Sequence, residues 1–270
     1  MSRWLSCAML LLMFTVQSCA GTGSSASTTA SPQPAAGDKD KKNPEQKDAL
    51  YSLTLMRQGS VLLQQEQYPE ALAKFEEANR VAPGNATVHN MIGLCHLQTK
   101  QYDKALSAFN TALDLAPSFT DARNNRGTTY LALGQLRLAE VDFIAVLSDS
   151  TYPHRYQVYY NLGATYFQQG QLGAAEENLR KAVTAPFPVF EAYVRLAEVV
   201  REQGRELEAL DLLEEAELRF PERPEAALAL GRMLVELGRI DEARPYLEEV
   251  MAKEPGSERA RQAAALLDAS

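Results

Sequence analysis

The chain has 270 residues and a formal net charge of −8 at pH 7, and 46% of its residues are hydrophobic. This hydrophobic fraction is ordinary for a soluble protein, and the acidic balance argues against nucleic acid as a partner. The negative charge is concentrated in residues 190–257, which hold 17 Asp and Glu against 9 Lys and Arg. We interpret this excess as a solvated face. The three cysteines, Cys7, Cys19 and Cys95, show no spacing typical of a zinc site or a disulfide framework.

Residues 1–18 are predicted to be a lipoprotein signal peptide. Arg3 precedes an apolar run, Trp4 to Phe14, which is too short to span a bilayer but fits the apolar region of a secretory signal. The following Val16-Gln17-Ser18-Cys19 resembles the lipobox of bacterial lipoproteins, although leucine and a small residue are usual where Val16 and Gln17 stand. The resemblance implies that Cys19 becomes the new N-terminus and carries a covalent diacylglycerol and an N-acyl chain. No other cofactor is expected.

The alternative is cleavage after Ala20, because Ser18-Cys19-Ala20 also suits ordinary signal peptidase. That processing would give a soluble periplasmic or secreted protein. We favour lipidation because residues 19–47 have the composition of a tether, rich in small and polar residues and without an aromatic one. Such a disordered segment would span roughly 30 Å. Since Ala20 is not the aspartate that retains many lipoproteins at the inner membrane, we expect the periplasmic face of the outer membrane, with the lipids as the only membrane contact.

From residue 52 onward the chain repeats with a period of 34 residues. Each unit has a small residue at position 8, alanine at position 20 and Phe or Leu at position 24. Facing small residues allow two helices to cross closely, and the large residue fills the space beside them. The pattern therefore predicts an all-α array of antiparallel helix pairs. The six repeats are 52–85, 86–119, 120–155, 156–189, 190–223 and 224–257.

Two further positions delimit the helices. Gly134, Gly170, Gly204 and Gly238 all stand at position 15, where a left-handed residue would end the first helix. These features resemble the tetratricopeptide repeat, which implies a right-handed α-solenoid within residues 48–270. Ser257 is a suitable N-cap for a last helix, so residues 258–270 are expected to cap the open end of the array.

The junction between repeats three and four is two residues longer than the others. Its sequence, together with the lipobox, tether and six repeats, resembles the type IV pilus pilotins of the PilF, PilW and Tgl type. That resemblance implies a scaffold that binds the secretin subunit of the pilus, needed for pilus biogenesis and twitching motility. The residues that carry it are Tyr152, Pro153, Arg155, Asn161, Leu162 and Gly163.

No catalytic or metal-binding motif is present in the sequence. His89 and His96 are seven residues apart, too far to share a metal as neighbours four apart can, and no phosphate loop or nucleophile motif appears. We therefore expect a protein partner and neither an enzyme nor a small-molecule substrate. Positions 2, 5, 9 and 12 of the first helices are expected to line a concave groove that suits a peptide from another protein. In repeats two to four the candidate residues are Asn90, Leu94, Leu97, Asn124, Thr128, Leu131, Tyr160 and Phe167.

The sequence thus favours an outer-membrane pilotin that promotes the localisation or multimer assembly of a secretin. The alternative is a general periplasmic adaptor in cell-envelope assembly, which would use the same groove for another client.

Overall fold

The computed structural model of the chain describes residues 43–184, 186 and 188–269. Every regular element within these ranges is a helix, so the all-α prediction is confirmed. The chain divides into two compact units, Met1–Gly84 and Asn85–Ser270, called unit 1 and unit 2 below. None of the described helices is long and apolar enough to cross a membrane. The expected signal peptide, Cys19 and most of the expected tether lie outside the described residues.

The described part of unit 1 contains two helices, α1 (Pro44–Gln64) and α2 (Tyr68–Val81), which pack against each other. Helix α1 begins inside the segment that the sequence assigns to the tether. The reason is local, because proline at the first helical position has its φ angle preset and lacks an N–H that would be unsatisfied there anyway. The two helices are further joined by the Ser52 hydroxyl, which donates to the Ala78 carbonyl over 3.1 Å.

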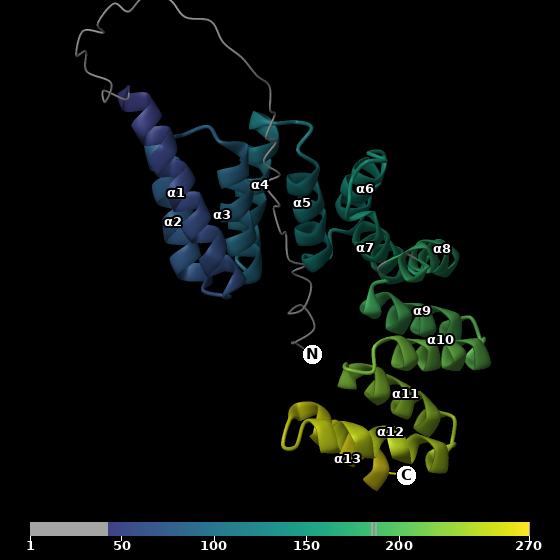
Figure 1. Cartoon of the computed structure of the whole chain (residues 1–270). Coiled ribbons are helices and arrows are strands. Elements are labelled where there is room, and N and C mark those ends of the chain that lie inside the picture. Colours follow the sequence, from purple (N-terminus) through teal and green to yellow (C-terminus); the bar gives the residue numbers. More distant parts are fainter. Residues whose placement is uncertain (1–42, 185, 187, 270) are drawn as a thin grey trace, which may run out of the picture. The chain divides into compact units, whose positions relative to one another are not determined.

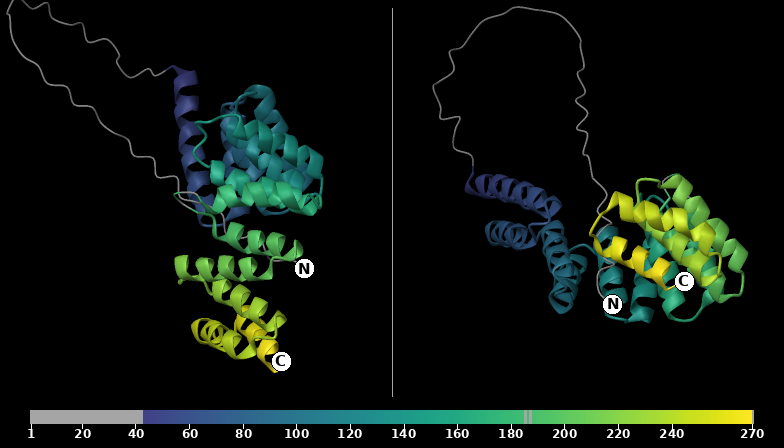
Figure 2. Two further views of the ribbon diagram at one scale, coloured as in Figure 1. Left: turned by 90° about the vertical axis from the view of Figure 1, so that its right-hand side faces the viewer. Right: turned by 90° about the horizontal axis from the view of Figure 1, so that it is seen from below.

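Unit 2 is a succession of antiparallel helix pairs in which each helix packs against the next along the chain (Figure 1). In Figure 2 the green-to-yellow helices α9 to α13 lie one after another in this way. The helices are α3 (Ala86–Gln98), α4 (Tyr102–Leu115), α5 (Thr120–Ala132), α6 (Leu136–Leu147), α7 (Arg155–Gln168), α8 (Leu172–Val183), α9 (Phe190–Glu202), α10 (Glu206–Arg219), α11 (Pro224–Glu236), α12 (Ile240–Lys253) and α13 (Glu258–Asp268).

In five of the six repeats the crossing of the helix pair is set by a glycine at position 8, and repeat five has Ala197 there. A Cβ placed on Gly93 would lie 2.5 Å from a ring carbon of Phe109, and one on Gly163 would lie 2.6 Å from Leu179 Cγ. Phe109 and Leu179 are the residues at position 24, and both are fully buried. The glycine thus allows the large side chain of the second helix to lie directly on the first helix. Burial of one such side chain contributes roughly 1.5–3 kcal/mol.

The turns inside the pairs adopt the expected left-handed backbone. The glycines at position 15 have φ angles between +71° and +78°, the latter at Gly204. In repeats one and two the same position is filled by Glu66 and Lys100, each with φ +59°. These two residues adopt a conformation that is unfavourable for a side chain with a Cβ.

Helix α13 packs against both α11 and α12. The Ser257 hydroxyl accepts a hydrogen bond from the Ala260 N–H at 3.0 Å, which confirms it as the N-cap. Buried Ala260 and Ala263 form the inner side of the helix. Helix α13 therefore covers the last repeat with small side chains.

Candidate protein-binding face

The first helices of the repeats in unit 2 lie next to one another. Helix α5 packs against α3 on one side and α7 on the other, and α7 also packs against α9. Their neighbouring sides form one surface, which we call the first-helix face. Seven candidate residues are partly exposed on their helices, namely Leu94, Leu97, Asn124, Thr128, Leu131, Tyr160 and Phe167.

Asn90 differs from the other seven candidates because it is only 1% exposed. Its side-chain oxygen accepts a hydrogen bond of 2.9 Å from the Nδ2 of Asn125 on α5. A buried amide with its acceptor satisfied in this way joins α3 to α5 and is not available to a partner. Asn125 was not among the residues selected from the sequence, although it directly follows Asn124.

The middle of the face, on α5 and α7, is polar and uncharged. The Nδ2 of Asn161 lies 3.5 Å from the hydroxyl of Thr128, which is a long contact. The same hydroxyl donates to the Asn124 carbonyl at 3.0 Å, so it can only accept a hydrogen bond from a bound chain. The Oδ1 of Asn124 is buried and has no hydrogen-bond partner among the described residues. An unsatisfied acceptor in this position can take a hydrogen bond from a bound chain.

The far end of the face is aromatic and includes a charged residue, Arg195, that is not among the residues predicted from the repeat. The guanidinium of Arg195, on α9, lies 5.2 Å from the ring centre of Phe167 on α7. Its NH1 donates to Glu198 Oε2 at 2.5 Å, while its Nε is buried without a hydrogen-bond partner in the described part of the chain. Burial raises the pKa of the neighbouring Tyr160 hydroxyl, which therefore stays neutral and can donate at neutral pH.

The junction residues that resemble the pilotin pattern make contacts within the chain. The Tyr152 hydroxyl donates to Asp121 Oδ1 at 2.9 Å, and burial, reinforced by Asp121, raises the pKa of Tyr152. The Arg155 NH1 donates to the carbonyl oxygens of Leu147 and Asp149 at 3.0 and 2.7 Å. These bonds hold the long loop against the ends of α5 and α6.

The remaining residues of that pattern lie in or beside α7. Asn161, Leu162 and Gly163 are buried, and Pro153 is exposed in the loop. Gly163 is the close-crossing position against Leu179, so its identity follows from packing. The pattern thus describes how repeats three and four are joined.

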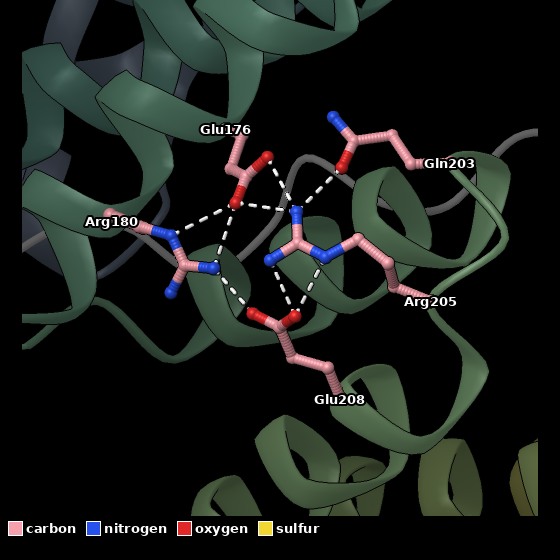
Figure 3. Close-up of polar contacts among 5 residues, drawn as sticks. All are labelled: Glu176, Arg180, Gln203, Arg205 and Glu208. Atoms are coloured by element: carbon pink, nitrogen blue, oxygen red, sulfur yellow. Dashed lines mark hydrogen bonds and ion pairs between the residues drawn. The ribbon is translucent and has the colours of Figure 1, made fainter.

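A cluster of charged side chains joins repeats four and five (Figure 3). Arg205 NH1 donates to both carboxylate oxygens of Glu176, at 2.8 and 2.9 Å, and its Nε donates to Glu208 at 2.7 Å. Arg180 bridges the same two carboxylates, and Gln203 accepts from Arg205 at 2.8 Å. Every charge in this cluster has a partner, so we interpret it as a connection between repeats.

The described residues contain no group of three His, Cys, Asp or Glu side chains that could hold a metal ion. Cys95, inside α3, is not part of a disulfide among the described residues and is 1% exposed. Its burial is typical of a packing residue.

Comparisons with known proteins agree with this architecture. Models of the tetratricopeptide repeat match residues 56–118, 156–186 and 200–267, which together make up more than half of the chain. The chain is a tetratricopeptide repeat protein. No curated protein sequence matches it.

Several solved structures share the tetratricopeptide repeat fold. PilW, a widely conserved type IV pilus biogenesis factor, is 24% identical with a TM-score of 0.71, over 79% of this chain and 98% of PilW. PilF of Pseudomonas aeruginosa is 17% identical with a TM-score of 0.67, over 81% of this chain and 99% of PilF. YrrB, described as having an unusual peptide-binding site, is 19% identical with a TM-score of 0.50, over 71% of this chain and 97% of YrrB. At these identities the shared property is the fold.

Proposed function

We propose that this tetratricopeptide repeat protein is an outer-membrane lipoprotein that acts as a pilotin. It would bind the secretin subunit of the type IV pilus and promote its outer-membrane localisation or its assembly into multimers. The observation that carries the proposal is the extent of the fold similarity, which includes 98% of PilW and 99% of PilF. PilW is described as a type IV pilus biogenesis factor, and PilF has a related name. The sequence pattern of the junction supports the same assignment.

The mechanism in this proposal is tethering and binding, without catalysis. Lipids on Cys19 would fix the chain to the membrane, and the residues between Cys19 and α1 would set its reach. The first-helix face would hold a segment of the secretin, so that subunits collect at a raised local concentration. An uncharged amide region on α5 and an aromatic region at α7–α9 suit a segment with both polar backbone groups and an apolar side chain.

The anchor is tested by a Cys19→Ala substitution, with Cys7→Ala as the matched control because Cys7 precedes the proposed cleavage site. Wild type and the Cys7→Ala variant should incorporate labelled palmitate and fractionate with the outer membrane, while the Cys19→Ala variant should not. Secretin multimers, followed in the same cells, should be lost or misplaced only with Cys19→Ala. If wild type takes up no label and is soluble, cleavage occurs after Ala20 and tethering is wrong. Label without any change in multimers would point to a general adaptor in the cell envelope.

The binding face is tested separately by capture of the secretin from detergent extracts. A Phe167→Ala substitution removes the ring under Arg195, and we expect at least a tenfold reduction in captured secretin. Leu218→Ala is the matched control, because Leu218 is 78% exposed on α10, a second helix. Equal capture by both variants would exclude this end of the face. Secretin multimers that stay unchanged after deletion of the whole gene would rule out the pilotin function.

A further inference from the structure

Asn124 has an unpaired side-chain amide in the middle of the first-helix face. Its Oδ1 is buried and has no hydrogen-bond partner among the described residues, and no described group bonds its Nδ2. The next residue, Asn125, differs because its amide is used within the chain, as a donor to Asn90 at 2.9 Å. Buried polar groups in folded proteins normally have a partner, so the free amide of Asn124 requires an explanation.

A free amide of this kind matches the backbone of an extended chain. In an antiparallel pair of strands, one residue directs both its N–H and its C=O at the same neighbour. A primary amide has an acceptor oxygen and two donor hydrogens, so the side chain of Asn124 can bond both groups at once. The terminal torsion of asparagine is soft, which allows the amide to turn its unsatisfied oxygen toward a bound chain. A helix uses its backbone groups internally and offers no such pair except at its ends.

Arg195 provides a second open group at a similar height on α9. Asn124 is the fifth residue of its repeat and Arg195 the sixth of its own. Helix α7 packs against both α5 and α9, and its residues at these two positions, Tyr160 and Asn161, are uncharged. The Nε of Arg195 is buried without a partner in the described part of the chain, whereas its NH1 is paired with Glu198. A second carboxylate would be repelled by Glu198, so the open donor suits a neutral carbonyl oxygen.

The spacing of the helices gives the length of chain that would join these two groups. Packed helices lie about 8–10 Å apart, so the two steps from α5 to α9 cover roughly 16–20 Å. An extended chain advances about 3.3 Å per residue, so about five or six residues cover this distance.

We propose that the first-helix face binds an extended, uncharged segment of its partner that crosses α5, α7 and α9. The N–H and C=O of one residue of the segment pair with the amide of Asn124, and the carbonyl of another accepts from Arg195 Nε. The inference rests on the proposed function in one respect, since both place the binding site on the first-helix face. It does not require that the segment belong to a secretin.

The first test uses a phage-displayed library of short random linear peptides, selected on the purified full chain. The best peptide is then synthesised with one N-methyl group at each backbone nitrogen in turn, and binding is measured by fluorescence anisotropy. Methylation of the nitrogen that donates to Asn124 should weaken binding at least tenfold in the parent and have little effect in Asn124→Leu, which already lacks the acceptor. If no nitrogen is sensitive, or if the peptide becomes helical on binding, the segment is not held as an extended chain and the proposal is wrong.

The second test compares substitutions with the unmodified peptide. Asn124→Leu should weaken binding at least tenfold, and Arg195→Lys, which keeps the charge but lacks Nε, should weaken it less. Asn79→Leu is the matched control, because Asn79 on the second helix α2 also has a buried Oδ1 without a partner among the described residues. It should bind like the parent. Asn124 and Arg195 are only partly buried, so their variants should keep the circular dichroism and melting temperature of the parent.

The outcomes separate this inference from the pilotin function. Peptide binding that depends on Asn124, without any capture of secretin, would support the extended segment and exclude the pilotin function. Secretin captured equally by Asn124→Leu and the parent would keep the pilotin function and overturn the extended segment. A selection that yields no peptide lost with Asn124→Leu would also overturn it.

Discussion

Repeat three and the junction of repeats four and five use charged side chains in different ways. In repeat three, Arg126 forms two parallel bonds of 2.8 Å to Asp142, whose side chain is only 3% exposed. Between repeats four and five, Arg205 joins Glu176 and Glu208 with its own side chain 39% exposed. The Arg126–Asp142 pair lies inside one repeat and is shielded from solvent. The contacts of Arg205 connect two repeats and remain exposed to solvent.

The difference shows where charge can be used in such an array. A buried pair is highly sensitive to loss of one partner, because the remaining charge stays without solvation. Exposed pairs contribute less each and are weakened by salt. A further exposed pair, between Arg201 of repeat five and Glu236 of repeat six, joins later repeats. We therefore expect the N-terminal repeats of unit 2 to be sensitive to single substitutions, and the C-terminal repeats to pH and ionic strength.

The largest expected effect comes from breaking the buried pair with Arg126→Leu. This substitution leaves Asp142 unpaired inside the repeat and should lower the free energy of unfolding by about 3–5 kcal/mol. Urea unfolding followed by circular dichroism measures the loss, and hydrogen exchange should locate it in α5 and α6. The double variant Arg126→Leu with Asp142→Leu should recover most of it. A loss below about 1 kcal/mol in the single variant would mean that the pair behaves like an exposed one.

The second prediction compares the helix crossings of repeats two and five. A Gly93→Ala substitution places a Cβ 2.5 Å from a ring carbon of the fully buried Phe109 and should destabilise by about 1–3 kcal/mol. Repeat five already has Ala197 at this position, opposite the smaller Leu213. The reverse substitution, Ala197→Gly, should cost about 1 kcal/mol through lower helix propensity. Equal stability of Gly93→Ala and the parent would show that the Phe109 ring can move aside.

The fold could be predicted because its determinants recur within each repeat. The glycine at position 8 and the Phe or Leu at position 24 contact each other within sixteen residues, so their spacing is visible in the sequence. The start of α1 at Pro44 could not be read in this way. It precedes the first complete repeat, and only the capping preference of proline marks it.

The candidate face was predictable only in outline. The repeat places residues on the correct side of each helix, but whether one is exposed depends on its neighbour in the next repeat. Asn90 is buried and bonded to Asn125, which is 35 residues away in the sequence. Arg195 contacts Phe167, which lies in the preceding repeat. Because the arginine side chain is long, such a contact is difficult to predict from the sequence. The charged cluster around Arg205 could not be predicted from the sequence for the same reason.

A third prediction concerns acid and salt at the junction of repeats four and five. Burial opposes ionisation of Glu176, but hydrogen bonds from Arg205 and Arg180 outweigh it and lower its pKa. Hydrogen bonds from Arg180 and then Arg205 also lower the pKa of Glu208. A carboxylate whose pKa is lowered in the folded state contributes stability above its ordinary value of 4.5, and that contribution is lost as the pH falls through the lowered pKa.

The protection of α8 to α10 against hydrogen exchange, taken relative to the intrinsic exchange rate at each pH, should therefore fall below about pH 4.5, and at neutral pH it should fall when the salt concentration rises to 1 M. The double variant Glu176→Gln with Glu208→Gln should lose most of both responses. Helices α5 and α6 serve as the internal control for the salt response, because their ion pair is shielded from solvent. If exchange in α8 to α10 does not depend on salt, the cluster does not stabilise the junction.

The smallest expected effect is at the turns of repeats two and five, which have the same hydrogen bonds but different residues. The Lys100 N–H donates to the Leu97 carbonyl and the Gly204 N–H to the Arg201 carbonyl, at 3.0 and 2.8 Å. Lys100 nevertheless holds a φ of +59°, where a side chain is strained. Lys100→Gly should therefore raise the free energy of unfolding by up to about 1 kcal/mol, and Gly204→Ala should lower it by about 1 kcal/mol. No described atom outside the local chain lies within 4 Å of a Cβ on Gly204, so its loss would report backbone strain alone. Urea unfolding measures both changes. If their signs are opposite, the effect of the backbone preference at the turn is distinguished from that of the charged contacts around the turn in repeat five.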